Sequence, residues 1–373
     1  MKKVLFLFSD TGGGHRSATE AIVEALELSY PGSFQISQVD VFKEYAPRPL
    51  DKTPDLYPEM TKLPLAWEVG YKLTDGQRRA RMLQTTFRPA IKRAVARIKQ
   101  DHPADLYVSV HPLFNAGFIR ELGPERPLFM TVVTDMITAH SFWYAPAVDV
   151  CIVATEQARQ RAIDNGVHPS KVDVIGLPVS QAHTRAPGDR KEYCRLLGYP
   201  EDLPVVLLVG GGEGMGPLQL TARALSKLDT PFALAIIAGR NKELLAEMRR
   251  KQWGRPVFFY GFEKRMPEMM RAASLLVTKA GPGTISEAMN AHLPTVLYSR
   301  LPGQEDGNVD FVVNSGTGYW APGPERTAAA VHRILSNPSI LAGMRQQCAL
   351  HARPEAATRI AARIASELAG LPD

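Results

Sequence analysis

The chain has 373 residues, a length that favours two domains, and its formal net charge is +6. Hydrophobic residues make up 45% and charged residues 22%, as in globular proteins, and no stretch approaches the ~20 apolar residues of a membrane span. The apolar run at 4–8 ends at Ser9, too soon for a signal peptide. The three cysteines are too scattered for a disulfide framework or a metal site, so we expect a reducing cytosol.

The first half of the chain predicts strands that alternate with helices, the pattern of a doubly wound parallel sheet. Val4–Phe8 is a continuous apolar run, and a glycine turn at 9–15 leads from it into a helical pattern that ends at 31–32. The further predicted strands are Gln35–Val41, Asp105–Val110, Leu128–Val133, Val150–Ala154 and Val172–Ile175.

Residues 46–100 interrupt this alternation. The segment begins with a proline-rich stretch and continues with Trp67 and Tyr71. It ends in a run rich in basic residues and poor in acidic ones, which contains Arg78, Arg79, Arg81, Arg88, Lys92, Arg93, Arg97 and Lys99. A long insertion in a compact α/β domain is usually functional. We expect a membrane surface, with cations for anionic headgroups and aromatic rings for the headgroup boundary. The alternative is a solvated helix face.

The second half repeats the opening pattern after a polar, turn-rich linker at 177–189. Pro204–Val209 is a predicted strand, residues 210–217 form a glycine loop, and a helix begins near Leu218. The other predicted strands are Ala233–Ala238, Pro256–Tyr260, Ser274–Thr278 and Pro294–Tyr298. The sequence therefore predicts domains at 1–180 and 181–354, with the alanine-rich residues 355–373 packing back on the first.

Each domain opens with a glycine loop that presents unpaired backbone N–H groups at a helix N-terminus, which is an anion site. A dinucleotide site is one alternative, since Asp40 ends the second strand where a ribose-binding acid would lie. The loop at 12–15 lacks the G-x-G-x-x-G spacing, and His15 would crowd a pyrophosphate, so we disfavour it.

Another glycine turn, in the segment Thr278–Ala288, leads into a helix with Thr284 at its start. Thr284-x-x-Glu287 fits a capping box, in which both side chains bind helix N–H groups. The functional alternative places a phosphate at Thr284 and a ribose at Glu287. Both interpretations use the same carboxylate.

The segment at 302–308 follows another predicted strand, and ligands of such sheets bind beyond the carboxyl ends of the strands. Gln304 and Glu305 offer an amide and a carboxylate, which suit sugar hydroxyls. The alternative is an exposed polar turn.

In these segments the chain resembles the monogalactosyldiacylglycerol synthases and the related processive diacylglycerol glycosyltransferases of glycosyltransferase family 28. The resemblance spans nearly the whole chain and is weakest at 46–100. The matching segments, in order, are Ser9–Arg16, Thr134–Asp135 with His140 and Trp143, Gly210–Pro217, Ala238–Asn241, Gly261–Phe262, Met266–Glu268, Thr278–Glu287 and Pro302–Asn308.

The resemblance implies a GT-B fold, with the donor nucleotide-sugar in the second domain, the acceptor in the first, inversion at the anomeric carbon, and no bound metal or other cofactor. It implies that Glu287 holds the ribose, the Phe262 backbone meets the uracil, and Gln304 and Glu305 meet the sugar. The remaining expected donor-binding residues, most of them around the diphosphate, are Gly212, Glu213, Arg240, Gly283 and Thr284.

His15 is the expected catalytic base, because inverting transfer requires one group to deprotonate the acceptor hydroxyl. The positive end of its helix should keep the imidazole neutral. Asp135 is expected to orient or assist it. The other residues assigned to the acceptor and the membrane are Gly14, His111, Trp143, Trp67, Tyr71, Arg78, Arg79 and Arg81.

The sequence thus predicts transfer of galactose from UDP-galactose to diacylglycerol by a peripheral protein on the cytoplasmic face of the membrane, with anionic lipids but no nucleic acid as partners. UDP-glucose as donor, or another lipid as acceptor, is the nearest alternative. A UDP-sugar epimerase and a non-catalytic binding protein are the alternatives of other classes.

Overall fold

A computed structural model describes residues 1–11, 13–48, 50–60, 63–112, 115–212, 214 and 216–371, without the side chains of 50, 57, 58 and 64. The chain forms two compact units. The first comprises Met1–Gln181, Pro302–Gln304 and Glu355–Asp373, and the second comprises Ala182–Leu301 and Glu305–Pro354. Each unit holds one six-stranded parallel sheet, which confirms the predicted α/β class with two doubly wound sheets.

The first sheet has the strand order β2-β1-β3-β4-β5-β6. Its inner strands are short runs of buried apolar residues, as expected where helices cover both faces. The strands are β1 (Lys2–Phe8), β2 (Phe34–Asp40), β3 (Leu106–Ser109), β4 (Leu128–Val132), β5 (Val150–Val153) and β6 (Val172–Val174).

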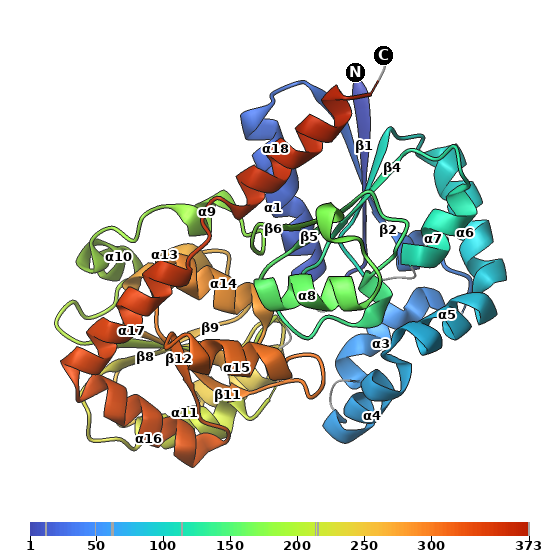
Figure 1. Cartoon of the computed structure of the whole chain (residues 1–373). Coiled ribbons are helices and arrows are strands. Elements are labelled where there is room, and N and C mark those ends of the chain that lie inside the picture. The colour runs from blue at the N-terminus through green and yellow to red at the C-terminus, as the bar shows by residue number, and fades with distance from the viewer. Residues whose placement is uncertain are drawn as a thin grey trace. The chain divides into compact units, whose positions relative to one another are not determined.

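Two helices cover one face of this sheet and three cover the other. On the first face, α1 (Gly14–Ser29) lies alongside α18 (Ala356–Ala369), the last helix of the chain (Figure 1). Ile360 and Ile364 of α18 are fully buried in the core that α1 shares. The other face carries α6 (Arg88–Asp101), α7 (Asn115–Leu122) and α8 (Glu156–Asp164).

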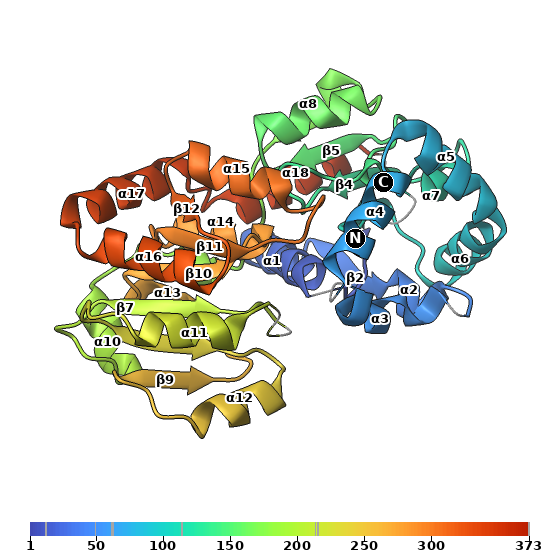
Figure 2. The same cartoon turned by 90° about the horizontal axis from the view of Figure 1, so that it is seen from below.

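The region without strand signal is helical, and its helices gather at one side of the first unit (Figure 2). They are α2 (Val41–Tyr45), α3 (Thr53–Met60), α4 (Pro64–Thr74) and α5 (Gln77–Thr86), followed by α6; the 3-10 turns of this unit are Leu50–Lys52, Ser141–Trp143 and Pro169–Lys171.

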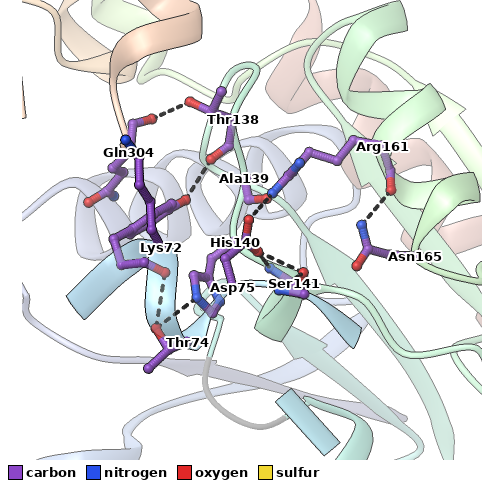
Figure 3. A network of polar contacts seen from close by, with 12 residues as sticks. Lys72, Thr74, Asp75, Thr138, Ala139, His140, Ser141, Arg161, Asn165 and Gln304 are labelled. Atoms are coloured by element: carbon purple, nitrogen blue, oxygen red, sulfur yellow. Dashed lines mark hydrogen bonds and ion pairs between the residues drawn. The ribbon is translucent and has the colours of Figure 1, made fainter. Parts of the chain in front are cut away.

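A polar network around Asp75, in the turn between α4 and α5, fixes this insertion to the first sheet (Figure 3). Asp75 accepts hydrogen bonds from the main chain of Ser141 at 2.9 Å and from its hydroxyl at 2.7 Å, and it pairs with Arg161 at 2.7 Å. Thr74 contacts His140 Nε2 at 3.1 Å. The segment that follows β4 is therefore held directly against the turn between α4 and α5.

The second sheet has the strand order β12-β11-β10-β7-β8-β9. Its strands are β7 (Val205–Val209), β8 (Ala233–Ile237), β9 (Val257–Tyr260), β10 (Leu275–Lys279), β11 (Thr295–Ser299) and β12 (Gly318–Trp320). The sequence did not predict β12, because three residues are too few to show a period.

The helices from 181 to 351 lie around this second sheet. They are α9 (Gln181–Thr184), α10 (Arg190–Leu197), α11 (Leu218–Ser226), α12 (Lys242–Arg249), α13 (Met266–Ala272), α14 (Pro282–Asn290), α15 (Asp306–Asn314), α16 (Pro324–Leu335) and α17 (Pro338–His351). One core lies under α11, α12, α16 and α17, and the other under α10, α13 and α14.

Within the part of the chain that the structure describes, no helix is long and apolar enough to cross a membrane.

Candidate functional site

In both sheets the chain adds strands first on one side of the first strand and then on its other side. Ligands of such sheets bind at the carboxyl ends of the strands beside this switch point. In the first sheet β1 lies between β2 and β3, and in the second β7 lies between β8 and β10. The expected site residues follow these strands.

His15 is the second residue of α1, whose N-cap Gly13 has a φ of 80°, a conformation that favours glycine. Its Nδ1 lies 2.8 Å from the Thr134 hydroxyl, and its ring centroid lies 4.5 Å from that of His111. Burial lowers the pKa of His15 to about 4, against smaller raising effects of the Val110 main chain and Asp10. The imidazole is therefore neutral, as expected, but burial rather than the helix end is the main cause.

Asp135 does not form the hydrogen bond to His15 Nδ1 that is expected of a group orienting the imidazole. That hydrogen bond goes to Thr134, the preceding residue, and Asp135 Oδ2 accepts from Trp143 Nε1 at 2.6 Å. Trp143 is fully buried, with its ring centroid 5.8 Å from that of His15. Asp135 thus supports the wall beside His15, and Trp143 cannot be a membrane-surface residue.

His111 is closer to His15 than the sequence indicated. It is buried, its Nε2 lies 3.0 Å from the Thr11 hydroxyl, and its Nδ1 has no hydrogen-bond partner among the described residues. Burial, with the neighbouring His15, holds the pKa of His111 well below its usual range. Two neutral histidines therefore stand side by side at the start of α1, where Gly14 is exposed.

The dinucleotide alternative is wrong, because Asp40 has another structural task. Its Oδ1 caps α2 by accepting from Lys43 N, and its Oδ2 accepts from Asp10 N, both at 3.1 Å. Asp40 is buried and cannot reach a ribose.

The glycine loop after β7 presses against the turn after β8. Gly214 and Gly239 have φ values of 63° and 61°, and a Cβ on either would come within 2.3 Å of a carbonyl oxygen of the facing turn. Only glycine allows so close a backbone approach. Gly212 O accepts from Arg240 N at 2.8 Å, which aligns the two turns.

Arg240 lies over the ring of Phe262, with its guanidinium 4.9 Å from the centroid. Phe262 is 60% exposed, so this pair forms an open platform beyond β8 and β9. Glu213, expected beside them, lies outside the described residues.

The structure adds a lysine that the sequence analysis missed. Lys279 ends β10, and its Nζ pairs with Glu305 Oε1 at 2.6 Å. A Cβ added to Gly211 would lie 3.3 Å from Lys279 Cε, and one added to Gly281 would lie 3.2 Å from Nζ. The ammonium group therefore lies among all three expected donor segments. Its position at the end of a strand beside the switch point was the available signal.

The capping-box interpretation of Thr284 and Glu287 is wrong. The N-cap of α14 is Gly281, with Pro282 as the first helical residue, and no side chain caps this helix. Thr284 and Glu287 are the third and sixth residues of α14, so both side chains are free for other partners. A Cβ added to Gly283, beside them, would meet no described atom within 4 Å.

Burial raises the pKa of the Glu287 carboxyl to about 7. The Nε2 atom of His183 lies 3.8 Å from Glu287 Oε1. Burial lowers the pKa of His183 to about 4, so the pair is not an ion pair near neutral pH. His183 lies in the linker and carried no sequence signal.

Glu305 is not part of an exposed turn, because it is only 3% exposed. Its two oxygens accept from Lys279 Nζ and, at 2.7 Å, from Leu301 N. Gln304 groups with the first unit, where its amide donates to Asp135 Oδ1 at 3.1 Å.

The residues expected at a membrane divide into two sets. The Tyr71 hydroxyl donates to Thr138 O at 2.6 Å and so anchors the insertion, whereas Arg79 donates to the main chain of Lys72 and Asp75 and joins α5 to α4 within it. Trp67 is half-buried. Arg78 and Arg81 are exposed on α5.

Comparisons with known proteins match both units. Residues 15–179 match the family model described as monogalactosyldiacylglycerol (MGDG) synthase, and residues 205–360 match the glycosyltransferase family 28 C-terminal domain. The chloroplastic monogalactosyldiacylglycerol synthase of Spinacia oleracea is 37% identical over 375 residues, 96% of this chain and 71% of that protein. Monogalactosyldiacylglycerol synthase 1 of Arabidopsis thaliana is 35% identical over 371 residues, 96% of this chain and 70% of that protein.

Solved structures share the fold at low sequence identity. The S. aureus MnaA–UDP structure has a TM-score of 0.65 at 14% identity and covers 100% of this chain and 98% of that one. Acinetobacter baumannii MurG has a TM-score of 0.62 at 15% identity, with 98% and 100% covered. The expected GT-B fold is confirmed.

The raised pKa of Glu287 predicts a pH-dependent stability. Because its pKa is 4.5 when solvated and about 7 in the fold, ionisation penalises folding increasingly from about pH 4.5 to pH 7. The penalty reaches up to about 3 kcal/mol at full ionisation. We therefore expect Glu287→Gln to raise the Tm at pH 8 and to leave it unchanged at pH 4.5.

Thermal melts at the two pH values measure this difference. The control is Glu325→Gln, which changes an exposed glutamate of the same unit. An equal Tm for Glu287→Gln and the native protein at pH 8 would show that Glu287 is solvated.

Proposed function

The chain belongs to the monogalactosyldiacylglycerol synthase family, and we propose that it transfers galactose from UDP-galactose to the sn-3 hydroxyl of 1,2-diacylglycerol, with inversion at the anomeric carbon. Its identity of 35–38% to plant members over about nine-tenths of the chain or more is the observation that carries this function. Incubation with UDP-galactose or UDP-glucose, with and without diacylglycerol, tests it. Monogalactosyldiacylglycerol as the main product supports it. A glucolipid product, or sugar conversion without lipid, contradicts it.

His15 acts as the general base in this reaction. In the tautomer that carries its proton on Nδ1, His15 donates to the Thr134 hydroxyl, and the lone pair on Nε2 can take the proton of the acceptor hydroxyl. The acceptor oxygen then forms its bond to the anomeric carbon as the bond to the diphosphate breaks, and the electron pair leaves with UDP. The neutral imidazole suits this role, because an imidazolium ion could not accept a proton.

Lys279 stabilises the diphosphate that leaves. A departing diphosphate gains negative charge, and preorganised positive groups at that point lower the barrier. Lys279 lies beside the two glycine turns that present backbone N–H groups, and Glu305 holds its ammonium group in place. Glu305 therefore acts on the donor through Lys279 as well as beside the sugar.

Glu287 binds the ribose, and Phe262 with Arg240 forms the base platform. Ribose hydroxyls would donate hydrogen bonds to the Glu287 carboxylate. The His183 beside this carboxylate is neutral and so adds no opposite charge. This assignment rests on the family resemblance and on the half-buried position of Glu287 in α14, outside the cap.

The protein docks on membranes through α4, peripherally and on the cytoplasmic face. Leu65, Val69 and Leu73 recur every four residues along one side of α4 and are 79%, 57% and 63% exposed. Large apolar side chains so exposed mark an interaction surface. Arg78 and Arg81 on α5 add attraction for anionic headgroups. The apolar stripe on α4 thus takes the place that the sequence assigned to Tyr71.

Replacement of His15 tests the base. We expect His15→Ala to lose about 10²–10⁴-fold in kcat, the usual range for acid–base catalysis, with UDP affinity unchanged. Native activity should stay level as pH falls to about 5 and drop only near the pKa of about 4. Thr134→Val should lower kcat less, because it removes only the orienting hydrogen bond. A folded His15→Ala protein with native kcat would exclude this base.

Replacement of Lys279 tests the diphosphate contact. Lys279→Met alone would leave Glu305 as an unpaired buried charge and disturb the fold, so the test variant is Lys279→Met with Glu305→Gln. We expect UDP affinity to fall roughly tenfold or more, since a charged hydrogen bond contributes about 1.5–3 kcal/mol. Uridine affinity should hardly change. Calorimetry with both ligands decides, and an equal loss for both would assign Lys279 to the fold instead.

Replacement of the α4 stripe tests membrane docking. The triple variant Leu65→Ser, Val69→Ser, Leu73→Ser should sediment poorly with vesicles and keep its Tm, because these side chains are already in water. The matched control replaces three equally exposed leucines of the second unit, Leu196, Leu220 and Leu350, by serine. Equal vesicle binding by both triple variants would refute docking through α4.

A further inference from the structure

A cavity of about 360 Å³ in the second unit lies at the amino-terminal ends of β10 and β11. Ala273 and His292, which precede these strands, are among its lining residues. Lys279 lies at the opposite end of β10, and a strand of five residues spans about 17 Å. The cavity is therefore distinct from the region around Lys279.

Three arginines line this cavity, and its lining contains no acidic residue. They come from three helices: Arg190 begins α10, Arg271 lies in α13 and Arg345 lies in α17. Among the residues that the structure describes, no carboxylate pairs with any of the three, although Arg195, one turn from Arg190, pairs with Glu201 at 2.8 Å. Charges removed from water normally have a counter-charge, because their desolvation is costly.

Main-chain carbonyls fix two of these guanidinium groups. Arg190 donates to the carbonyls of Glu201 and Leu203, and Arg271 donates to those of Ala182 and Arg185. Carbonyl oxygens hold the groups in place without neutralising them. Arg271 is only 7% exposed, and its Nε is buried without a hydrogen-bond partner among the described residues. One donor of this buried cation beside the cavity is thus unsatisfied among the described residues.

Arg345 is the third cation and is half-buried. Burial and the nearby charge of Arg190 both lower the pKa of Arg345. Arg190 and Arg345 line the same cavity, and an anion between their guanidinium groups would offset the repulsion of like charges.

His292 places a further nitrogen donor in the lining of the cavity, and its backbone conformation there is unfavourable for a residue with a side chain. It follows the end of α14 with a φ of 52°, the left-handed conformation that glycine usually provides there. It is the only described residue other than glycine with a positive φ. Histidine therefore places an imidazole in the lining of the cavity at a position where glycine would be less strained.

We infer that this cavity, lined by Arg190, Arg271, His292 and Arg345, binds the phosphate group of a phosphomonoester, either a free metabolite or a lipid headgroup. Planar guanidinium groups match phosphate oxygens in pairs, which explains three arginines rather than lysines. The site is independent of the donor nucleotide and of the transfer reaction.

Calorimetric titration with glycerol 3-phosphate at saturating UDP tests this inference, because UDP then occupies the donor site. A separate titration with UDP alone shows whether the nucleotide binds, so that absence of UDP binding is not mistaken for absence of phosphomonoester binding. We expect one phosphomonoester to bind, and Arg345→Gln to weaken its binding roughly tenfold or more, as for a lost charged hydrogen bond. Arg326→Gln, an exposed arginine of the same unit, is the control and should bind normally.

His292→Gly gives a second test that a purely structural role cannot satisfy. Glycine relieves the strained φ, so the Tm without ligand should stay level or rise, while phosphomonoester affinity falls. Vesicles of neutral lipid, with and without a phosphomonoester lipid, identify the source of the phosphate. If the ligand is a lipid headgroup, the native protein should bind the vesicles that contain the phosphomonoester lipid more strongly than Arg345→Gln does, and the two proteins should bind neutral vesicles equally. No binding of either form of the phosphomonoester, or equal binding of it by native protein and Arg345→Gln, would overturn the inference.

Discussion

The ion pair between Lys279 and Glu305 organises the polar end of the second unit. It joins the end of β10 to the start of α15, and its ammonium group lies beside the glycine turns at Gly211 and Gly281. The turn after β7 also approaches the turn after β8 closely, which is possible only because Gly214 and Gly239 lack side chains. A buried pair of this kind is not necessarily a source of stability, but loss of one partner would leave a buried charge. The ion pair therefore fixes the ammonium group that we propose holds the diphosphate.

In the first unit, too, polar side chains gather at the carboxyl ends of neighbouring strands, but these side chains are neutral. His15, His111 and Thr134 follow β1, β3 and β4, three neighbouring strands whose carboxyl ends meet at one edge. Burial keeps both imidazoles neutral, and each has a hydroxyl partner. The Asp75 network ties the segment after β4 to the helical insertion. The helix α4, through which we propose that the protein docks on membranes, is thus connected through a few hydrogen bonds to the segment that follows β4.

Charge compensation distinguishes the two polar ends of the second sheet. At the carboxyl ends of its strands Lys279 has an acidic partner, whereas at the amino ends three arginines share a cavity without one among the described residues. The first arrangement can exist without a ligand, and the second gains stability from one. This difference explains why a phosphomonoester would bind at the amino ends independently of the nucleotide.

The sequence by itself determined the two parallel sheets, because buried strands and glycine turns are local patterns of apolar period and backbone freedom. It also determined the family, and it identified His15, Glu287 and Glu305 as candidate site residues. Only the tertiary structure decided their partners. Thr134 rather than Asp135 meets His15, Lys279 meets Glu305, and Tyr71 turns inward while Leu65, Val69 and Leu73 face water. Hydrogen-bond partners, burial and the resulting pKa values depend on which strand ends become neighbours, and no local pattern in the chain encodes that adjacency.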